Sequence, residues 1–371
     1  MSKKKLGFTV NPIAGMGGRV GLKGTDGQEI LRRARELGAV LTSPTRAVEA
    51  LKEISPIKNN IDLITYPYDM GEDEARKCSF NPIVIGSIER GKTTSTNTKN
   101  AAREMSRLKV DLILFAGGDG TARDIYDAIG DKVPALGIPT GVKIHSGVFA
   151  TSPKSAGKLA AMHLQGQAPV RELEVMDVDE QAFREDRVSA KLCGYLRVPF
   201  ERRMVQNPKT GSVAGEEEAT EAIACEVIDN MQDDFLYIIG PGTTTRPIME
   251  KLGLKKTLLG VDVIRKGELL ALDVNEAQLL KLIEDKKAKI VVTVIGGQGY
   301  IFGRGNQQIS SKVVRKVGKE NLIIVATENK VASLRGRPLL VDTDDDEVNE
   351  MLKDYTKVIT GYGRSILYKV A

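Results

Sequence analysis

Short apolar runs alternate with amphipathic patterns along the first third of the chain. The apolar runs end at glycine or proline, as buried strands do, and they cover residues 6–12, 62–67, 81–86, 110–118 and 134–141. Apolar residues recur at helical spacing in the segments between them, which are residues 27–38, 45–54, 72–78, 98–109 and 122–130. This alternation predicts an α/β domain with a parallel, Rossmann-like sheet over residues 1–150.

The pattern changes near Thr151. Polar and apolar residues then alternate, as in half-exposed strands, through residues 168–179, 188–201 and 221–229. Helical patterns return in residues 275–287, 311–318 and 345–355. We therefore expect a β-rich, mixed second domain over residues 151–371, with the last helix and strand either inside it or packed back on the first domain. A polar stretch, residues 206–220, is predicted to be a surface loop.

The chain has 37 glycines, and many gather directly behind the apolar runs. The main clusters are residues 15–18, 117–120, 240–242 and 296–305. Glycine lets the backbone approach a ligand closely, and ligands of parallel α/β sheets bind at the carboxyl ends of the strands. The clusters therefore predict a ligand site at that edge of the sheet.

The charge distribution indicates the kind of ligand. The net charge is +5, and the only basic cluster is Lys3–Lys5, while the other basic residues are dispersed among the glycine-rich segments. This pattern favours a small phosphate-bearing metabolite and argues against nucleic acid. No apolar run approaches the roughly 18 residues that a membrane span needs, so we expect no membrane partner.

The cysteine and histidine contents narrow the chemistry. Cys78, Cys193 and Cys225 lie far apart and outside any CxxC spacing, which is typical of reduced thiols in a cytoplasmic protein. His145 and His163 are the only histidines, which argues against a multi-histidine metal site and against a Ser/His/Asp triad. Any metal is therefore expected to be Mg²⁺, bound by carboxylates and phosphates.

The sequence NPIAGMGG, residues 11–18, follows the first predicted strand. The backbone N–H groups of such a loop can turn toward an anion, and a side-chain amide and a nearby lysine add a donor and a positive charge. The predicted phosphate-binding residues are Asn11, Gly15, Gly17, Gly18 and Lys23. A glycine-rich turn that binds no ligand is the alternative.

The sequence GGDGT, residues 117–121, places an acid between glycines at the end of a buried strand. In a kinase, a carboxylate can accept the proton of the acceptor hydroxyl or hold Mg²⁺. Asp119 is predicted to have this catalytic or metal-linked role. The neighbouring residues, predicted to bind phosphates, are Gly117, Gly118, Gly120 and Thr121. The alternative is a turn in which the aspartate caps a helix.

The sequence GSIERGKT, residues 86–93, matches the Walker A pattern behind a predicted strand. Lys92 would then contact the β and γ phosphates, and Thr93 would hold Mg²⁺. A polar, β-branched run follows, however, and delays the next helix to about Thr98, whereas a P-loop helix begins at once. A P-loop and a polar loop that borders the same site both stay open.

GGDGT, together with NPIAGMGG upstream and GIPTGVKIHSGVFATSP downstream, resembles the ATP-NAD kinase family, near its branch of acetoin-catabolism protein X. This family shares a superfamily with diacylglycerol-type lipid kinases, and the likeness covers the first 155 residues. It implies a Mg²⁺-dependent kinase that transfers a phosphoryl group from ATP, or from polyphosphate, to NAD or a related nucleotide, giving NADP in the first case. The resemblance also implies that Asp119 activates the acceptor hydroxyl. It further implies that subunits associate into a homodimer or tetramer.

The second half departs from the family pattern. IIGPGTTTRPIME resembles the family's glycine- and threonine-rich turn, which implies a place near the nucleotide for Gly240, Gly242, Thr243, Thr244 and Thr245. The family's Asn-Glu or Asn-Asp pair for the acceptor ribose has no clear match. The two available pairs are interpreted as capping or surface residues, and they are Asn275–Glu276 and Asn349–Glu350.

Two further segments offer polar groups. Lys143 is predicted to neutralise a phosphate, whereas His145 is either a site residue or a structural one. Arg304, Asn306 and Gln307 lie in GGQGYIFGRGNQQIS and are candidates for recognising a phosphate or a base. The alternative for this segment is a glycine-punctuated turn, since its glycine spacing is one position too long for GxGxxG.

Three alternatives to an NAD kinase stay open. A kinase of this kind could act on another acceptor, such as ADP-ribose, a nucleoside, a sugar or a lipid. A P-loop NTPase would use Lys92 instead. A nucleotide-binding regulator would keep the pocket without turnover, because the glycines of binding sites and of catalytic sites look alike.

Overall fold

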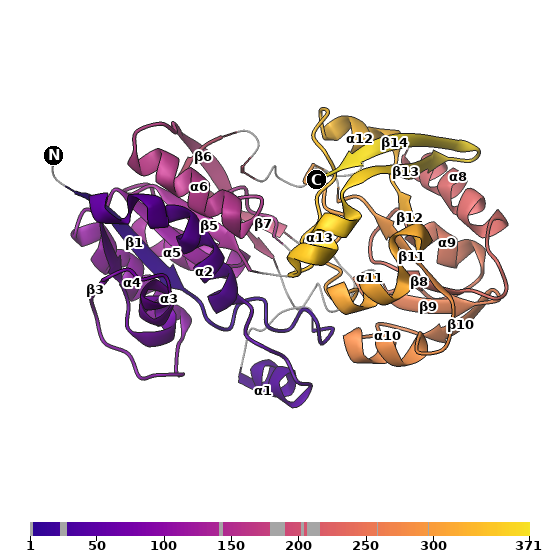
Figure 1. Cartoon of the computed structure of the whole chain (residues 1–371), viewed down its shortest axis with the longest axis horizontal. Coiled ribbons are helices and arrows are strands. Elements are labelled where there is room, and N and C mark those ends of the chain that lie inside the picture. Colours follow the sequence, from indigo (N-terminus) through magenta and orange to yellow (C-terminus); the bar gives the residue numbers. More distant parts are fainter. Residues whose placement is uncertain are drawn as a thin grey trace. The chain divides into compact units, whose positions relative to one another are not determined.

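The chain folds into two compact units, which are described in turn (Figure 1). The computed structural model describes residues 3–22, 28–140, 144–178, 190–201, 204–205, 216–257, 259–295 and 297–371. The first unit comprises Met1–Met16, Gly24–Gly27 and Val40–Pro208. The second comprises Gly17–Lys23, Gln28–Ala39 and Lys209–Ala371.

The first unit is built on a five-stranded parallel sheet in the order β3-β2-β1-β4-β5. Its strands are β1 (Lys4–Val10), β2 (Ile61–Thr65), β3 (Ile83–Val84), β4 (Leu112–Gly117) and β5 (Ala135–Pro139). The side chains of β1 and β4 are almost continuously buried, which explains why their apolar runs could be recognised in the sequence. The predicted α/β domain is confirmed.

Helices pack around this sheet in pairs. Helix α2 contacts α6, and α4 contacts α5. The helices of this unit are α2 (Ser43–Ile54), α3 (Glu72–Lys77), α4 (Ser95–Arg107), α5 (Asp119–Ile129) and α6 (Pro153–Leu164), with the short 3-10 turns η1 (Ser55–Asn60) and η2 (Tyr68–Met70). Phe115 and Phe149 meet edge to face in the core, with ring centroids 5.4 Å apart.

An antiparallel hairpin, β6 (Val170–Val178) and β7 (Ala190–Pro199), completes the first unit. It packs on α5, and β7 also contacts β5. Both strands lie where alternating patterns predicted them, but α6 was not expected. The change of pattern near Thr151 therefore does not coincide with the division between the compact units, which lies at Pro208.

The second unit contains a seven-stranded mixed sheet in the order β10-β9-β8-β11-β12-β13-β14. Its strands are β8 (Leu236–Ile239), β9 (Asp262–Arg265), β10 (Glu268–Ala271), β11 (Ala288–Thr293), β12 (Leu322–Val325), β13 (Asp354–Gly361) and β14 (Arg364–Val370). Strands β8, β11, β12 and β13 run parallel, and the outer strands are antiparallel. The expected mixed second domain is confirmed. The last two strands, β13 and β14, belong to this sheet rather than to the first one, and the last helix packs in a core of the same unit.

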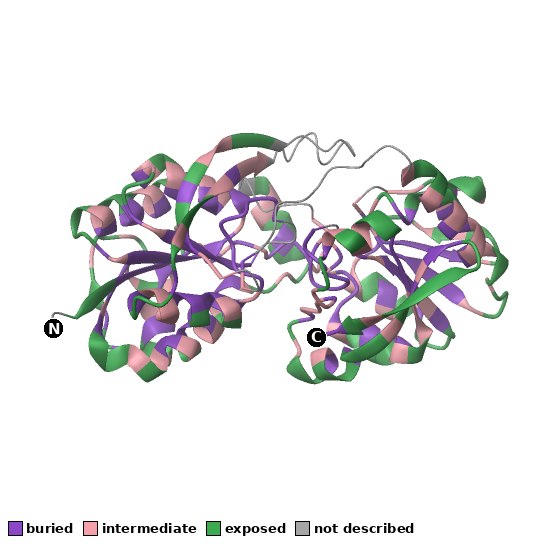
Figure 2. Ribbon diagram, turned by 90° about the horizontal axis from the view of Figure 1, so that it is seen from above, coloured by how far each residue is buried: buried purple, intermediate pink, exposed green. Residues whose placement is uncertain are grey.

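Two apolar cores lie on this sheet, one containing residues of α8 and α9, the other residues of α10, α11 and α13. The helices and turns of the unit are α1 (Gln28–Glu36), α8 (Glu216–Asp229), α9 (Arg246–Lys251), α10 (Glu276–Leu282), α11 (Ser311–Val317), η3 (Lys319–Asn321), α12 (Glu328–Ser333) and α13 (Asp346–Leu352). Figure 2 shows buried residues concentrated along the strands of each unit.

One predicted strand is wrong. Residues 221–229 were expected to alternate as a strand, but they form most of helix α8. Ile223, Ala224 and Val227 are buried together, which is the spacing of one helical face, and they pack in the same core as residues of the sheet. A short alternating stretch is compatible with either period, and tertiary packing decides between them here. The predicted loop of residues 206–220 lies mostly outside the described residues.

Candidate functional site

The carboxyl ends of β1 and β4 form the topological switch point of the first unit. The chain leaves β1 for β2 on one side and leaves β4 for β5 on the other, and such points bind ligands in open α/β sheets. Asn11 follows β1, and its side-chain amide donates to the Thr121 hydroxyl at 3.0 Å. The backbone nitrogen of Asn11 also donates to the carbonyl of Ala116 at 2.9 Å. The structure thus brings the two predicted phosphate-binding segments into direct contact.

Asp119 is the first residue of helix α5, and only 8% of it is exposed. Its two carboxylate oxygens accept hydrogen bonds from the backbone N–H groups of His145, at 2.8 Å, and Ser146, at 2.9 Å. The His145 ring nitrogen Nδ1 lies 3.4 Å from one of these oxygens. A carboxylate has about four acceptor sites, so two bonds fix its orientation and leave acceptor capacity for a proton or a metal.

Ser146 connects this carboxylate to strand β6. Its hydroxyl accepts from the backbone nitrogen of Met176 at 2.9 Å and donates to the Met176 carbonyl at 3.3 Å. The next residue, Gly147, donates from its nitrogen to the carbonyl of Glu174 at 2.9 Å. The segment that holds Asp119 is therefore itself held by the hairpin, a relationship that no local sequence signal indicates.

Two of the predicted glycines are required by close packing. At Gly15, which has φ +75°, a Cβ atom would lie 1.7 Å from the carbonyl oxygen of Thr140. At Gly117 a Cβ atom would lie 2.4 Å from side-chain atoms of Thr121. Gly118 caps α5, and a Cβ atom at Gly120 would meet nothing within 4 Å. The backbone around Asp119 is thus compact on one side and open at Gly120.

The site described in the first unit does not include four other predicted phosphate-binding residues. Gly17 and Gly18 belong to the second unit, where their carbonyls accept hydrogen bonds from Leu22, at 2.9 Å, and Gly21, at 3.2 Å. Lys23 and Lys143 lie outside the described residues. Their predicted roles stay predictions.

The donor set at Asp119 fits Mg²⁺ only in part. Carboxylate oxygen is a suitable ligand, and Mg²⁺ in kinases takes its remaining ligands from substrate phosphates and water. Within the described ranges, no group of three or more His, Cys, Asp or Glu side chains is placed to hold a metal. Asp119 is the residue that would contact the ion, together with the phosphates.

The Walker A match forms a surface loop. Its lysine, Lys92, is 72% exposed and pairs with Glu89 at 2.7 Å. Helix α4 begins three residues later at Ser95, where the backbone nitrogen of Thr94 donates to the Asn97 side chain at 2.9 Å. The preceding strand, β3, has two residues and lies at the edge of the sheet. This geometry favours the polar-loop interpretation over the P-loop.

The glycine- and threonine-rich turn of the second unit follows β8, as its sequence predicted. Thr245 donates to the carbonyl of Gly240 at 2.7 Å, and Gly242 has φ +124°. Thr244 is fully buried, and its hydroxyl accepts from the ammonium of Lys330 at 2.5 Å. Thr243 is exposed. Sequence reasoning missed Lys330, which lies 86 residues away and has no recognisable motif around it.

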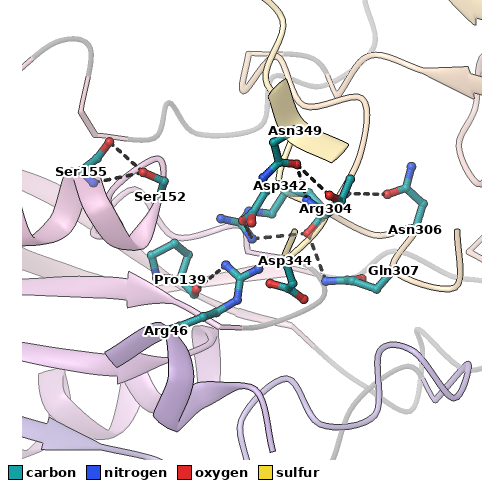
Figure 3. A network of polar contacts seen from close by, with 12 residues as sticks. Arg46, Pro139, Ser152, Ser155, Arg304, Asn306, Gln307, Asp342, Asp344 and Asn349 are labelled. Atoms are coloured by element: carbon teal, nitrogen blue, oxygen red, sulfur yellow. Dashed lines mark hydrogen bonds and ion pairs between the residues drawn. The ribbon is translucent and has the colours of Figure 1, made fainter. Parts of the chain in front are cut away.

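Arg304, Asn306 and Gln307 make contacts within the protein (Figure 3). The Arg304 guanidinium, 2% exposed, pairs with Asp342 at 3.1 Å and lies 4.7 Å from the ring centre of Tyr300. Asn306 donates to the carbonyl of Ile301 at 2.8 Å and accepts from the nitrogen of Gly303. These contacts stabilise a turn, and they favour the scaffold interpretation of this segment.

The candidate ribose-binding pairs also have structural contacts. The Asn275 side chain caps α10 by accepting from the nitrogen of Gln278 at 3.0 Å. The Asn349 side chain accepts from the nitrogen and hydroxyl of Thr343, at 3.0 and 2.8 Å. Asn275 therefore has the capping role that the sequence indicated, whereas Asn349, expected to cap a helix or lie on the surface, is half-buried and holds Thr343.

A parallel α/β unit with glycine-rich turns and a buried carboxylate at its switch point is typical of proteins that bind phosphates or nucleotides. The model of the ATP-NAD kinase N-terminal domain matches residues 6–168, and that of the C-terminal domain matches residues 232–370. The chain belongs to the ATP-NAD kinase family. The described part of the chain has no helix that is both long and apolar enough to cross a membrane.

Solved structures similar to this chain include proteins from Bacillus anthracis str. Sterne that are described as diacylglycerol kinases. One is 16% identical with a TM-score of 0.26, and the match covers 48% of this chain and 46% of that chain. Another is 19% identical with a TM-score of 0.24, covering 48% of each chain. The chain thus matches about half the length of these proteins. A search among curated proteins found no match.

Proposed function

We propose that the protein is a Mg²⁺-dependent kinase that transfers a phosphoryl group from ATP, or from polyphosphate, to a hydroxyl of NAD or a related nucleotide. The observation that carries the proposal is the buried Asp119 carboxylate at the switch point, oriented by two backbone N–H groups. Family membership supports the same activity.

The chemistry assigned to Asp119 is proton acceptance. The O–H bond of the acceptor breaks and its proton passes to a carboxylate oxygen of Asp119. The acceptor oxygen then bonds to the γ-phosphorus, whose bond to the bridging oxygen breaks to release ADP. Mg²⁺, when bound, neutralises charge on the phosphates. Asn11 and Thr121 hold the two phosphate-binding segments together, and Gly120 leaves the backbone accessible.

The turn of residues 240–245 is proposed to contact the nucleotide as well. Its resemblance to the family's threonine-rich turn is the support, and Lys330 fixes Thr244 in this turn. The acceptor ribose has no assigned partner, because Asn275 and Asn349 are engaged in capping and support. NAD is therefore the first acceptor to test among several.

Assembly and location extend the proposal. The family resemblance supports association into a homodimer or tetramer, which light scattering on the purified protein tests directly. All three cysteines are free thiols, and this supports a cytoplasmic, reducing environment.

The activity is tested by incubating the full chain with ATP or polyphosphate and a panel of acceptors, and reading product masses. NAD, NADH, ADP-ribose, nucleosides, sugars and diacylglycerol form the panel. A mass increase of one phosphoryl group on NAD supports the proposal, while transfer to another acceptor revises the substrate. Nucleotide binding without any phosphorylated product would point to a regulator instead.

A further inference from the structure

A cavity of about 380 Å³ lies in the second unit, and none of the proposed nucleotide-binding residues lines it. It lies where three parallel strands begin: Phe235 precedes β8, Lys287 precedes β11, and Asn321 precedes β12. The backbone supports this edge, since the nitrogen of Leu236 donates to the carbonyl of Lys287 at 2.9 Å. The cavity is large enough for a small metabolite.

This location separates the cavity from the turn of residues 240–245. That turn follows the carboxyl end of β8, whereas Phe235 lies at the amino end of the same strand. At about 3.3 Å per residue, the five steps from Phe235 to Gly240 correspond to roughly 17 Å. The cavity and the turn therefore lie at opposite ends of β8.

The cavity walls combine positive charge with apolar surface. Among the residues that the structure describes, three exposed lysines, Lys286, Lys287 and Lys316, line it, and no acidic residue does. The apolar part comes from Phe235, together with Ile283 and Val317, which are 2% and 6% exposed. Such a lining matches a ligand with an anionic group and an apolar or planar body.

The charged groups next to the cavity leave it basic. Lys287 pairs with the exposed Asp234 at 3.2 Å and lies 5.6 Å from the ring centre of Phe235. A fourth lysine, Lys289, lies 4.7 Å from the same centre. Glu320 accepts from the Asn321 side chain at 3.2 Å. Two lysines thus lie near the aromatic ring at one end of the cavity.

We propose that this cavity is a second ligand site, specific for a phosphorylated small molecule, with Lys286 and Lys316 contacting the phosphate and Phe235 contacting the ligand body. Lysines near a helix C-terminus can be present only to offset the helix dipole, but this explanation covers just one of the two lysines. Lys316 lies in the last turn of α11, where a cation is favourable, but Lys286 lies beyond the end of α10 at Leu282. Being distant from the residue 240–245 turn, the site is suited to an effector.

A tryptophan reporter tests this site. The chain has no tryptophan, so Phe235→Trp places the only one in the cavity. Inorganic tripolyphosphate and AMP are titrated separately against the full-length variant while its fluorescence is recorded. We expect the fluorescence to change saturably with each probe. Because the apolar wall can contact the base of AMP, AMP should bind more tightly per phosphate group than tripolyphosphate.

Two further substitutions give the specificity control. Lys316→Gln in the Phe235→Trp background should weaken binding about tenfold, because charge-assisted bonds to phosphate contribute strongly. Lys312→Gln, an exposed lysine on the same helix that does not line the cavity, should leave binding unchanged. Equal effects of both substitutions, or no saturable signal with either probe, would overturn the proposal.

A second measurement does not depend on the reporter folding. Equilibrium dialysis of the unmodified protein against AMP should give one more bound molecule per chain than the same experiment with Lys286→Gln/Lys316→Gln. Equal stoichiometry in the two proteins would contradict the proposal. Because binding is read directly, the outcome is independent of whether the protein is an active kinase.

Discussion

A carboxylate oxygen of Asp119 lies 2.9 Å from the backbone nitrogen of Ser146, whose hydroxyl is hydrogen-bonded to both backbone groups of Met176. The proposed proton acceptor is therefore oriented by a residue that the β6–β7 hairpin holds in place. Ser146 is 1% exposed, so water does not compete for these bonds. We therefore expect a buried side chain, rather than one that contacts the substrate, to fix the orientation of this carboxylate.

Ser146→Ala keeps the backbone N–H that contacts Asp119 but removes the hydroxyl that anchors it to Met176. We expect kcat to fall about 10–100-fold, because small displacements of a catalytic group are costly, while KM for ATP changes little. Steady-state kinetics measure both constants. Ser152→Ala is the control: it removes a cap of α6, which costs about 1 kcal/mol of stability without touching Asp119.

The sequence predicted the elements that local patterns determine. The apolar runs before residues 11 and 118 predicted the strands β1 and β4. The glycines that follow these runs predicted a ligand site at the carboxyl ends of the strands, where the switch point lies. Contacts between distant segments could not be predicted. Neither the Ser146–Met176 bonds nor the contact between Thr244 and Lys330 has a local signal, because each depends on how strands and loops pack.

Errors in the predicted elements have a related cause. Residues 221–229 are short and weakly patterned, so either period fits them, and packing against the sheet selects helix α8. Arg304 looked available for a ligand because a sequence does not reveal the Asp342 carboxylate beside it. A polar residue between glycines therefore marks a turn as readily as a binding site.

Lys92→Ala tests the two phosphate-loop interpretations. Lys92 is exposed and pairs only with Glu89 among the contacts described, so we expect less than a tenfold loss of kcat/KM for ATP. Gly15→Ala should instead abolish activity, since its Cβ atom would collide with the Thr140 carbonyl. Loss of ATP binding in Lys92→Ala with Gly15→Ala active would favour the P-loop.

Arg304→Ala should act on stability rather than on the acceptor. It removes the guanidinium that pairs with the largely buried Asp342 carboxylate, and breaking a buried ion pair typically costs about 3–5 kcal/mol. Chemical denaturation measures this loss, and Arg304→Ala/Asp342→Ala should recover part of it. A selective rise in KM for the acceptor, with stability unchanged, would restore Arg304 as a recognition residue.

Glu74 makes the stability of the first unit depend on pH. Burial raises the pKa of its carboxyl to about 7 from an ordinary value of 4.5, and only 1% of the residue is exposed. Between these two values the folded state holds a proton that the unfolded state releases, so stability falls as pH rises from about 4.5 to 7. The loss is roughly 3 kcal/mol.

Glu74→Gln removes this titration, since glutamine stays neutral in both states. Denaturant unfolding at pH 5 and pH 7.5 should show a smaller loss of stability for the variant than for the unmodified protein. Glu72→Gln, on the same short helix, serves as the matched control. An identical pH dependence in Glu74→Gln and the unmodified protein would refute the assignment.

Asp119→Asn tests the central claim most directly, in a single-turnover assay of phosphoryl transfer with the best acceptor from the mass screen. We expect the single-turnover rate of phosphoryl transfer to fall by a factor of roughly 10²–10⁴, because a positioned proton acceptor has been removed. ATP should still bind. Asn also points an amide N–H at a backbone donor, so the fold of the variant is checked by its unfolding midpoint. Asp127→Asn, on the same helix and 41% exposed, should retain full activity. Full activity in Asp119→Asn would contradict the account.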